Sequence, residues 1–532
     1  MGQYLETNDR ALRGHLTVQL TSEKVDDFHE KLLRWADNQQ GVAIYYSNLN
    51  HQQTPNCIAS DLELIAGIGI ASELAMPTSS AFPTSFTPPD SSTSSVFPTS
   101  SKLSTPQSSP TSSTSSTLPT LPYTHSAPAK QTNPGQAEPQ IQAIKKANSF
   151  SQLQTWYDQH QDWLFGHLSY DLKNELERLN SKNPDNIGFS RLRFFQPIYV
   201  FELRKGLLQL YYLKSHCTQQ QANDLINELI QPIASASSST TSTTFQAAHQ
   251  CPIIQSKVKQ EQYIQNVTEL LKQIEYGNTY EINYCIEFFS QMQLQNPVET
   301  YLKLNQSARA PFSAYYRQGD SYLLCSSPER FLLKQQGRVY SQPIKGTAPR
   351  AKDLVQDTFQ KESLLHSLKE ATENTMIVDL VRNDLSKNAQ PNSLKVDELL
   401  GVYTFNRVHQ LISTISASPL PNSPITQIIK DAFPMGSMTG VPKVKAMQLI
   451  DQFESTARGL YSGSVGYITP TGDFDFNVVI RSIQYNAQSQ YLSMMVGSAI
   501  TAQSDAEQEY QECLLKVSGL IEALELNQIA AV

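Results

Sequence analysis

A stretch rich in serine, threonine and proline, from Pro77 to about Gln140, divides the chain and limits where a folded core can form. Segments within it, such as Ser91–Ser95 and Ser108–Ser113, contain few apolar residues. Such a composition buries too little apolar surface to offset the entropy lost on ordering. We therefore predict a disordered insertion over residues 77–140, either a tolerated surface insertion or a regulatory phosphorylation tract.

A second polar stretch, residues 235–250, is predicted to be a linker between two folded regions. Residues 251–532 are compositionally even and form the larger region, which opens with a helix ending near Gly277. Residues 1–76 and 141–234 are expected to form an N-terminal α/β part. Its predicted elements are a helix over Val25–Trp35, strands over Val42–Tyr46 and Leu62–Ile70, and a hairpin of Phe194–Leu203 with Leu207–Leu213.

Charge and cysteine content exclude several classes of function. The chain of 532 residues carries a net charge of -8 and has no basic block, so neither nucleic acid nor a membrane is expected as a partner. The six cysteines are scattered without a CxxC pair, which argues against a zinc site or a disulfide framework. Reduced thiols and the absence of an apolar leader near Met1 predict a cytoplasmic protein.

The turn Ser341–Arg350 holds one amine, Lys345, in a rigid setting. Pro343 and Pro349 restrict the backbone on both sides. Gly346 allows close approach of a ligand, and Thr347 adds a hydroxyl group. This turn either presents a reactive lysine or is a surface turn with a solvated lysine, and other residues must decide between the two.

Two pairs of glutamates are spaced to share one helical face each. Glu370 with Glu373, and Glu509 with Glu512, lie three positions apart. They are either solvated acidic faces or two helices facing each other around a divalent cation such as Mg2+. Lys516 follows Glu512 by one turn and is placed to reach a substrate carboxylate.

Glu329 falls in an apolar strand region, sixteen positions before Lys345. It is either ion-paired, with Arg330 as a candidate partner, or a buried general acid with a raised pKa. Two further segments offer backbone N–H groups for binding an anion: the loop from Phe433 into a helix at Lys443–Phe453, and Val496–Ile500.

Taken together, these segments resemble the chorismate-binding enzymes, the family that includes anthranilate synthase component I and aminodeoxychorismate synthase component I. The resemblance extends from about Gln260 to Leu524, and the N-terminal part matches only loosely, around Phe165–Asp171. The matching motifs occur in the family's order: Ser327–Arg330, Pro343–Thr347, Glu373–Asp384, His409–Thr414, Phe433–Met447, Ser462–Tyr467, Val479–Ser482 and Glu509–Glu512.

The resemblance implies a role for each matched position. Glu373 and Glu512 would bind Mg2+, supported by Glu370 and Glu509. His409 would lie beside the substrate ring. The two carboxylates of chorismate would be held by Gly346, Thr347, Tyr461, Arg481, Lys516 and the amides of Gly497, Ser498 and Ala499. A substrate with two carboxylates needs cationic side chains and N–H groups, and a bound cation needs carboxylates. The implied residues supply both kinds of group.

The lysine loop distinguishes activities within the family. Anthranilate synthases carry Pro-Ile-Ala-Gly-Thr, whereas aminodeoxychorismate synthases typically carry the Pro-Ile-Lys-Gly-Thr found here. The lysine version implies that Lys345, neutral when desolvated, adds to the ring while Glu329 protonates the departing 4-hydroxyl. Anthranilate synthesis and a catalytically silent binding subunit are the alternatives. Isochorismate synthesis is a third option, but isochorismate synthases place a lysine where this chain has Glu281, which argues against it. Glu281 also differs from the glutamine of many relatives.

The resemblance also implies a fold and partners. The expected class is α+β, with two packed antiparallel β-sheets, helices on the outside and the site between the sheets. No cysteine has the Gly-x-Cys-x-Gly setting of a glutamine amidotransferase, so a separate amidotransferase subunit would supply ammonia, and a separate lyase would form 4-aminobenzoate. Ala499 and Met435 replace glycines common in relatives, which bears on the shape of the pocket.

Overall fold

The computed structural model describes residues 12–48, 62–77, 148–177, 179–231 and 253–526. Apart from Pro77, the predicted insertion at residues 77–140 lies outside this range, as do the predicted linker at 235–250, Cys57 and Cys251. The predicted domain boundaries therefore stay a prediction. None of the described helices is long and apolar enough to cross a membrane.

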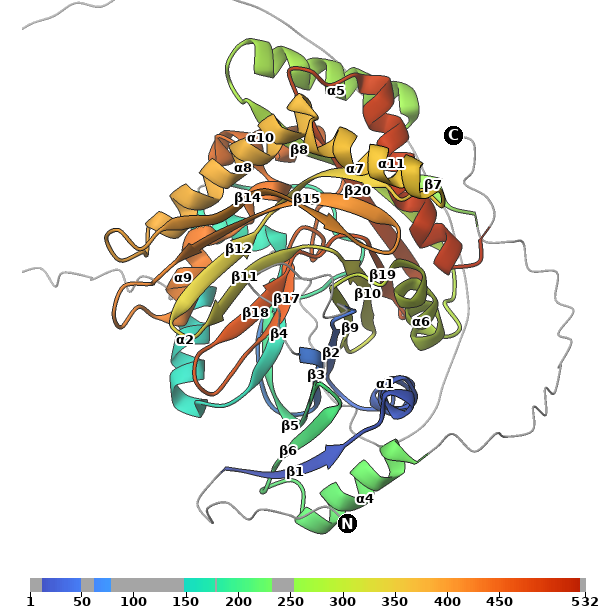
Figure 1. Cartoon of the computed structure of the whole chain (residues 1–532), viewed down its shortest axis with the longest axis vertical. Helices are drawn as coiled ribbons and strands as arrows, with labels where there is room; N and C mark the ends of the chain where they lie inside the picture. Colours follow the sequence, from blue (N-terminus) through green and yellow to red (C-terminus); the bar gives the residue numbers. More distant parts are fainter. Residues whose placement is uncertain (1–11, 49–61, 78–147, 178, 232–252, 527–532) are drawn as a thin grey trace, which may run out of the picture. The chain divides into compact units, whose positions relative to one another are not determined.

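The described part of the chain contains runs of strands separated by helices (Figure 1). The strands are β1 (Arg13–Gln19), β2 (Val42–Tyr46), β3 (Leu62–Met76), β4 (Leu164–Leu168), β5 (Leu192–Arg204), β6 (Leu207–Leu213), β7 (Gln255–Ser256), β8 (Glu281–Gln291), β9 (Phe312–Gln318), β10 (Ser321–Ser327), β11 (Arg330–Gln335), β12 (Arg338–Gln342), β13 (Ile344–Pro349), β14 (Lys395–Thr404), β15 (Val408–Ala417), β16 (Gly440–Val441), β17 (Ser464–Ile468), β18 (Phe474–Asn477), β19 (Ser482–Asn486) and β20 (Tyr491–Thr501). The helices are α1 (Ser22–Ala36), α2 (Ser149–His160), α3 (Lys173–Leu176), α4 (Gln219–Ile230), α5 (Gln260–Glu275), α6 (Pro297–Ala308), α7 (Leu354–Leu365), α8 (Leu368–Ser386), α9 (Ile425–Ala432), α10 (Lys443–Phe453) and α11 (Ala506–Ala523).

The strands form one antiparallel hydrogen-bonded network. From one end it runs β14–β15–β12–β11–β18–β17–β4–β5, and it continues β3–β2–β9–β10–β19–β20–β8. β13 pairs with β15 near the first end, and β16 pairs with β8 at the other. The predicted α+β class with antiparallel sheets is confirmed, and hydrogen bonds make the two sheets continuous.

Strands from the N-terminal part complete this network. β4 pairs with β17, where Gly166 lies opposite Gly466, and β2 pairs with β9. A Cβ atom on Gly166 would lie 2.0 Å from the carbonyl oxygen of Arg193 on β5, so this close strand approach requires glycine. The N-terminal strands β2 and β4 therefore form the middle of the network, although they are far from the lysine loop in sequence.

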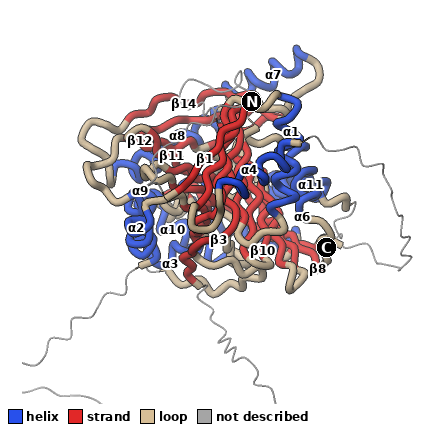
Figure 2. The backbone as a smooth tube through the Cα atoms, turned by 90° about the horizontal axis from the view of Figure 1, so that it is seen from below, coloured by secondary structure: helices blue, strands red, loops and turns tan. Residues whose placement is uncertain are grey.

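Helices lie on both sides of the strands (Figure 2). α7 and α8 pack against β13 and β15, and α5 and α11 pack against β20. Apolar side chains of these helices and strands form buried clusters, in which Ile377 of α8 and Val517 of α11 are fully covered. The packing fixes α8 and α11, which carry the paired glutamates, relative to the two ends of the network.

Most element predictions are confirmed, with small differences at the ends. α1, β2, the β5–β6 hairpin, α5 and α10 match their predicted positions. β3 is longer than predicted, because the chain continues as a strand through Gly69, which has a φ of 75°, to Met76. Glu329 lies in the short break between β10 and β11 rather than within a strand.

Candidate active site

Lys345 lies on β13, near one end of the strand network. β13 pairs with β15 in an irregular register, because the pairing shifts between Ile344 and Thr347. Gly346 occupies this shift with a φ of 96°, and a Cβ atom there would lie 3.1 Å from a carboxylate oxygen of Glu370. The bulge therefore needs glycine and brings the lysine loop against α8. Thr347 is exposed on the same strand.

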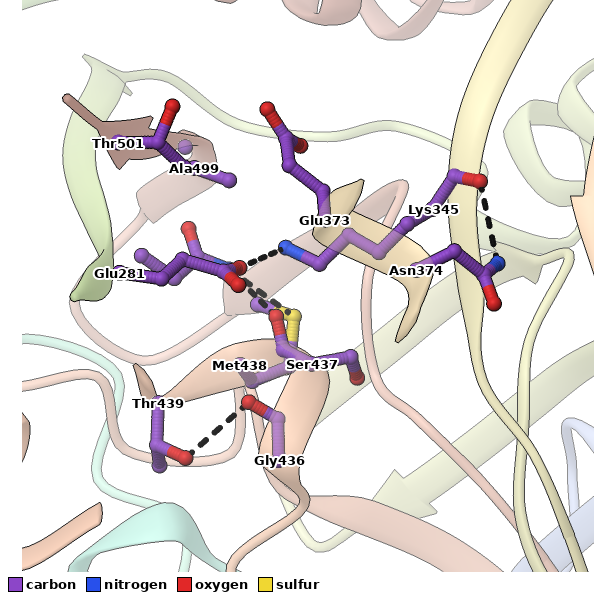
Figure 3. A network of polar contacts seen from close by, with 12 residues as sticks. Glu281, Lys345, Glu373, Asn374, Gly436, Ser437, Met438, Thr439, Ala499 and Thr501 are labelled. Carbon is purple, nitrogen blue, oxygen red and sulfur yellow. Dashed lines mark hydrogen bonds and ion pairs between the residues drawn. The ribbon is translucent and has the colours of Figure 1, made fainter. Parts of the chain in front are cut away.

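The side chain of Lys345 reaches across to β8, at the other end of the network (Figure 3). Its Nζ atom lies 2.6 Å from Oε1 of Glu281, and 10% of the lysine side chain is exposed. Burial disfavours the charged lysine, but Glu281, Glu373 and Glu329 outweigh it and raise the pKa of Lys345. The prediction of a neutral lysine is therefore wrong for the free protein, because desolvation is opposed by carboxylates.

Glu329 is buried, with 5% of its surface exposed. Burial raises its pKa to about 7, although the ammonium group of Lys345 opposes this shift. The expected alternative, an ion pair with Arg330, is wrong, because Arg330 forms a two-point contact with Asp475 at 3.0 Å. Glu329 is thus set apart as a carboxyl group that can hold a proton near neutral pH.

The glutamates of α8 and α11 meet around one lysine. Nζ of Lys369 lies 3.5 Å from Oε1 of Glu509 and 4.0 Å from Oε1 of Glu373. Burial raises the pKa of Glu373 to about 7, and it also raises the pKa of Glu370. The structure thus brings Glu373 and Glu509 together across two helices, so these two carboxylates are not on separate solvated faces, whereas the side chain of Glu512 is exposed.

These carboxylates can accommodate a divalent cation. Oε1 of Glu373 is buried and accepts no hydrogen bond, and the ammonium group of Lys369 occupies the space between the helices as a cation would. Lys369 is 40% exposed, so it is free to swing outward. As they stand, no three metal-ligating side chains in the described residues converge on one point.

Glu512 and Lys516 form a second contact on α11. Their ion pair is 2.5 Å long, and the Lys516 ammonium also donates to the Gly497 carbonyl oxygen at 2.6 Å. The side chain of Glu512 is 45% exposed, so only partial burial disfavours its charge, and Lys516 outweighs this and lowers the pKa of the carboxyl. The hydroxyl oxygen of Ser498 lies 2.9 Å from the hydroxyl oxygen of Tyr263. Ala499 lies opposite Asn283 in the pairing of β20 with β8. The last residues of β20 thus lie against α11, and these are the residues predicted to bind the substrate carboxylates.

Arg481 and Tyr461 lie in the same region. Arg481 has a φ of 50°, a left-handed conformation that arginine rarely adopts. Burial lowers the pKa of its guanidinium, whereas Tyr461 and Glu512 oppose the change. Its backbone carbonyl oxygen accepts a hydrogen bond from the Ser326 amide at 3.0 Å. A half-buried guanidinium held by a strained backbone suits a ligand carboxylate.

His409 is fully engaged by protein groups. Its Nε2 atom lies 3.1 Å from Oδ1 of Asp357 on α7, and Nδ1 lies 2.9 Å from the hydroxyl of Thr404. Asp357 also accepts hydrogen bonds from the Arg350 side chain and the Ala351 backbone. His409 therefore links α7 to β15, and its expected place beside a substrate ring stays a prediction.

Three of these contacts were missed at the sequence level. The sequence marks Glu281 only as a difference from related enzymes, and no pattern in it singles out Lys369 or Asp357. No spacing signal connects Glu281 with Lys345, because β8 and β13 are far apart in the chain. Asp357 precedes His409 by 52 residues, so only the packing of α7 on β15 reveals the pair.

The chain was compared with known proteins. The family described as chorismate binding enzyme matches residues 110–522. Aminodeoxychorismate synthase component 1 of Klebsiella aerogenes is 37% identical over 270 residues, which cover 51% of this chain and 59% of that protein. An anthranilate synthase component I-like protein of Synechocystis is 30% identical over 373 residues, covering 69% of this chain and 73% of the relative. The chain thus spans somewhat more than half of the first relative's length.

Solved structures agree on the fold. The menaquinone-specific isochorismate synthase MenF of Escherichia coli superposes with a TM-score of 0.64 at 17% identity, covering 96% of this chain and 94% of that chain. At this identity the likeness concerns the fold alone. The family match spans more than half of the sequence and includes the lysine loop, both glutamate pairs and Arg481. The chain therefore belongs to the chorismate-binding enzyme family.

Proposed function

We propose that this protein is an aminodeoxychorismate synthase component I, which converts chorismate and ammonia to 4-amino-4-deoxychorismate. The observation that carries the proposal is Lys345, an amine inside a carboxylate-lined site where anthranilate-forming relatives are expected to have alanine. The names of several relatives, including the Klebsiella protein, support the same activity. Glutamine hydrolysis would occur on a separate amidotransferase subunit, and the protein would work in the cytoplasm.

The proposed chemistry assigns one task to each buried group. Nζ of Lys345 adds to the ring carbon beside the one that bears the carboxylate, the two ring double bonds shift, and the 4-hydroxyl leaves as water with the proton of Glu329. Ammonia then attacks carbon 4, and the bond to Lys345 breaks. Glu329 suits the acid role because burial raises its pKa to about 7.

Substrate binding would use the groups around β20 and α11. Arg481, Tyr461, Lys516 and the amides of Gly497–Ala499 would hold the carboxylates, together with Gly346 and Thr347 on β13. Glu373 and Glu512, supported by Glu370 and Glu509, would hold Mg2+. When bound, this ion would neutralise a substrate carboxylate and stabilise the charge that develops on it. The free oxygen of Glu373 supports the assignment.

Turnover of chorismate in the presence of Mg2+ and an ammonium salt tests the proposal. We expect 4-amino-4-deoxychorismate, detected as 4-aminobenzoate after adding the lyase. The Lys345→Ala variant should lose this product, whereas Lys352→Ala, in the exposed turn after the same loop, should retain it. Anthranilate fluorescence without added lyase would favour anthranilate synthesis, which the name of the Synechocystis relative suggests. No turnover by the wild type would favour a silent binding subunit.

A further inference from the structure

Glu281 is the first residue of β8 and is held rigidly at the edge of the site. It pairs with Thr501 of β20 on one side and with Val441 of β16 on the other. Only 1% of its side chain is exposed. In Figure 3 its carboxylate points toward the end of the Lys345 side chain. A strand paired on both sides leaves this carboxylate little freedom to move away from the lysine.

The contact between Glu281 and Lys345 is incomplete as a structural ion pair. Oε1 lies 2.6 Å from Nζ, but Oε2 is buried and has no hydrogen-bond partner among the described residues. A buried carboxylate oxygen without a partner costs free energy, and buried ion pairs are weak sources of stability. An arrangement with this cost suggests a role beyond holding the fold together.

The proposed reaction creates a need that this contact can meet. An ammonium group has no lone pair, so Nζ must lose a proton before it can bond to carbon. Several carboxylates stabilise the charge on Lys345, namely Glu281 on β8, Glu373 on α8 and Glu329 before β11, and they hold the amine protonated. The positive charge of Lys345 also acts on Glu370 and Glu512, where it favours the charged carboxylate and so works to lower the pKa. Among the ion pairs of the described residues, Lys345 has one partner, Glu281.

We propose that Glu281 is a catalytic residue that takes the proton from Nζ of Lys345 and returns it at the end of each cycle. This inference rests on the proposed covalent function. In the first step the proton moves from Nζ to Oε1, and the nitrogen lone pair forms the bond to the ring carbon. The C4–O bond breaks as Glu329 gives its proton to the leaving oxygen, which departs as water.

The second step restores every group. Ammonia forms a bond to carbon 4, and the electron pair of the carbon–nitrogen bond to Lys345 returns to Nζ. The new C4 ammonium gives one proton to Glu329, and Nζ recovers its proton from Glu281. The overall change is chorismate plus ammonia to aminodeoxychorismate plus water, with no oxidant or further base required. Glu281 and Glu329 thus act as a complementary base and acid on the two sides of the ring.

Formation of the lysine adduct without ammonia tests the role of Glu281 directly. Wild-type protein mixed with chorismate and Mg2+ should gain the mass of chorismate minus water on the peptide that contains Lys345. Glu281→Gln keeps the shape but removes the proton acceptor, and should slow adduct formation at pH 7 by about 100-fold. The deficit should shrink as the pH rises, because hydroxide then removes the proton.

Rescue separates proton transfer from a structural role. Formate should restore adduct formation in Glu281→Ala, where it can enter the vacated space, but not in Glu281→Gln. Glu281→Asp should retain more activity than Glu281→Gln. Glu287→Gln is the matched control, because Glu287 is also buried on β8 and also has an unpaired Oε2. It should form the adduct at the wild-type rate.

The outcomes distinguish this inference from the proposed function. If Glu281→Gln forms the adduct as fast as the wild type at every pH, Glu281 is not the proton acceptor, although the covalent mechanism stands. If the wild type turns over chorismate without any adduct on Lys345, both ideas are overturned. Should Glu281→Gln fail to fold, formate rescue of Glu281→Ala decides the question, and the absence of rescue in folded protein would refute the role.

Discussion

At the scale of single residues, the site is defined by buried acidic and basic side chains whose charges interact. The positive charge of Lys345 is stabilised by Glu281, Glu373 and Glu329, which come from three separate parts of the fold. Each carboxylate is buried, yet their surroundings differ, since Glu281 touches the ammonium and Glu329 does not enter an ion pair with it. Different environments allow chemically identical groups to act as base, acid and metal ligand.

Replacing Glu329 by glutamine tests its role as the acid. Burial raises the pKa of Glu329 to about 7, so the group is protonated and competent below that pH. The wild-type rate of the chemical step should therefore fall as the pH rises above 7. Glu329→Gln should be slower by about 100-fold and lose this decline. A variant that keeps the wild-type pH profile would assign the acid to another group.

Gly346→Ala tests the bulge that presents Lys345. Alanine at a φ of 96° is strained, and its Cβ atom would also lie 3.0 Å from Leu411 and 3.1 Å from Glu370. We expect unfolding in urea to show a loss of about 2 kcal/mol. Gly337→Ala is the control, because Gly337 has a φ of 76° but no atom within 4 Å of its Cβ position. Equal losses in the two variants would mean that the contacts with Leu411 of β15 and Glu370 of α8 add nothing.

At the scale of elements, α7 and α8 form a cover over β13 and β15. α8 is tied to the lysine loop by Asn374, which donates to the Lys345 carbonyl oxygen at 3.3 Å. α7 is tied by Asp357, which contacts Arg350 and His409. The position of α7 thus depends on a few polar contacts rather than on a large apolar face, since Leu354, Val355 and Phe359 are exposed.

Asp357→Asn tests this attachment of α7. The Arg350 guanidinium holds the pKa of Asp357 well below its usual value, so the carboxylate is charged at neutral pH. Removing the charge should weaken the contacts with Arg350 and His409, and amide exchange in α7 should become about tenfold faster. Glu362→Gln, at an exposed position of the same helix, should leave exchange unchanged. Unchanged exchange in Asp357→Asn would show that other contacts hold α7.

At the scale of the whole molecule, one strand network joins the N-terminal strands to the site. β4 lies between β17 and β5, and it carries His167, which is fully buried. The His167 ring lies 2.8 Å from the hydroxyl of Tyr316 and 2.7 Å from the Ser190 carbonyl oxygen. The stability of the site is thus linked to residues near the centre of the network.

The lowered pKa of His167 predicts that the folded protein loses stability in acid. Burial lowers the pKa of His167 to about 3, whereas an unfolded histidine has a pKa near 6.5. The unfolded state therefore binds the proton first, so this contribution is complete above pH 6.5 and is lost as the pH falls toward 3. Between pH 7 and pH 5 the loss should be about 2 kcal/mol.

Denaturant unfolding at several pH values measures this effect. His29 has the same lowered pKa, about 3, and adds a loss of the same sign. His167→Gln should unfold more easily at pH 7 but show a shallower decline in acid. His216→Gln, at an exposed position, should follow the wild type. An unchanged slope in His167→Gln would exclude His167 as a source of the acid sensitivity.

The sequence by itself determined the family, the helices with their paired glutamates and the lysine loop. Glu370 with Glu373 and Glu509 with Glu512 follow from helical spacing, and the rigid turn around Lys345 follows from the flanking prolines. These features depend on neighbours along the chain, where periodicity and backbone preference act directly. Periodicity does not determine where a strand ends, as β3 shows, because pairing with β5 extends this strand past its glycines.

Only the tertiary structure decided which charges meet. Glu281 contacts Lys345 from the far end of the strand network, Lys369 lies between two helices, and Arg330 pairs with Asp475 rather than Glu329. The charge state of Lys345 could not be read from its own loop, because burial and three distant carboxylates act in opposite directions. Electrostatic interactions depend on distance in space, and sequence separation carries no information about it.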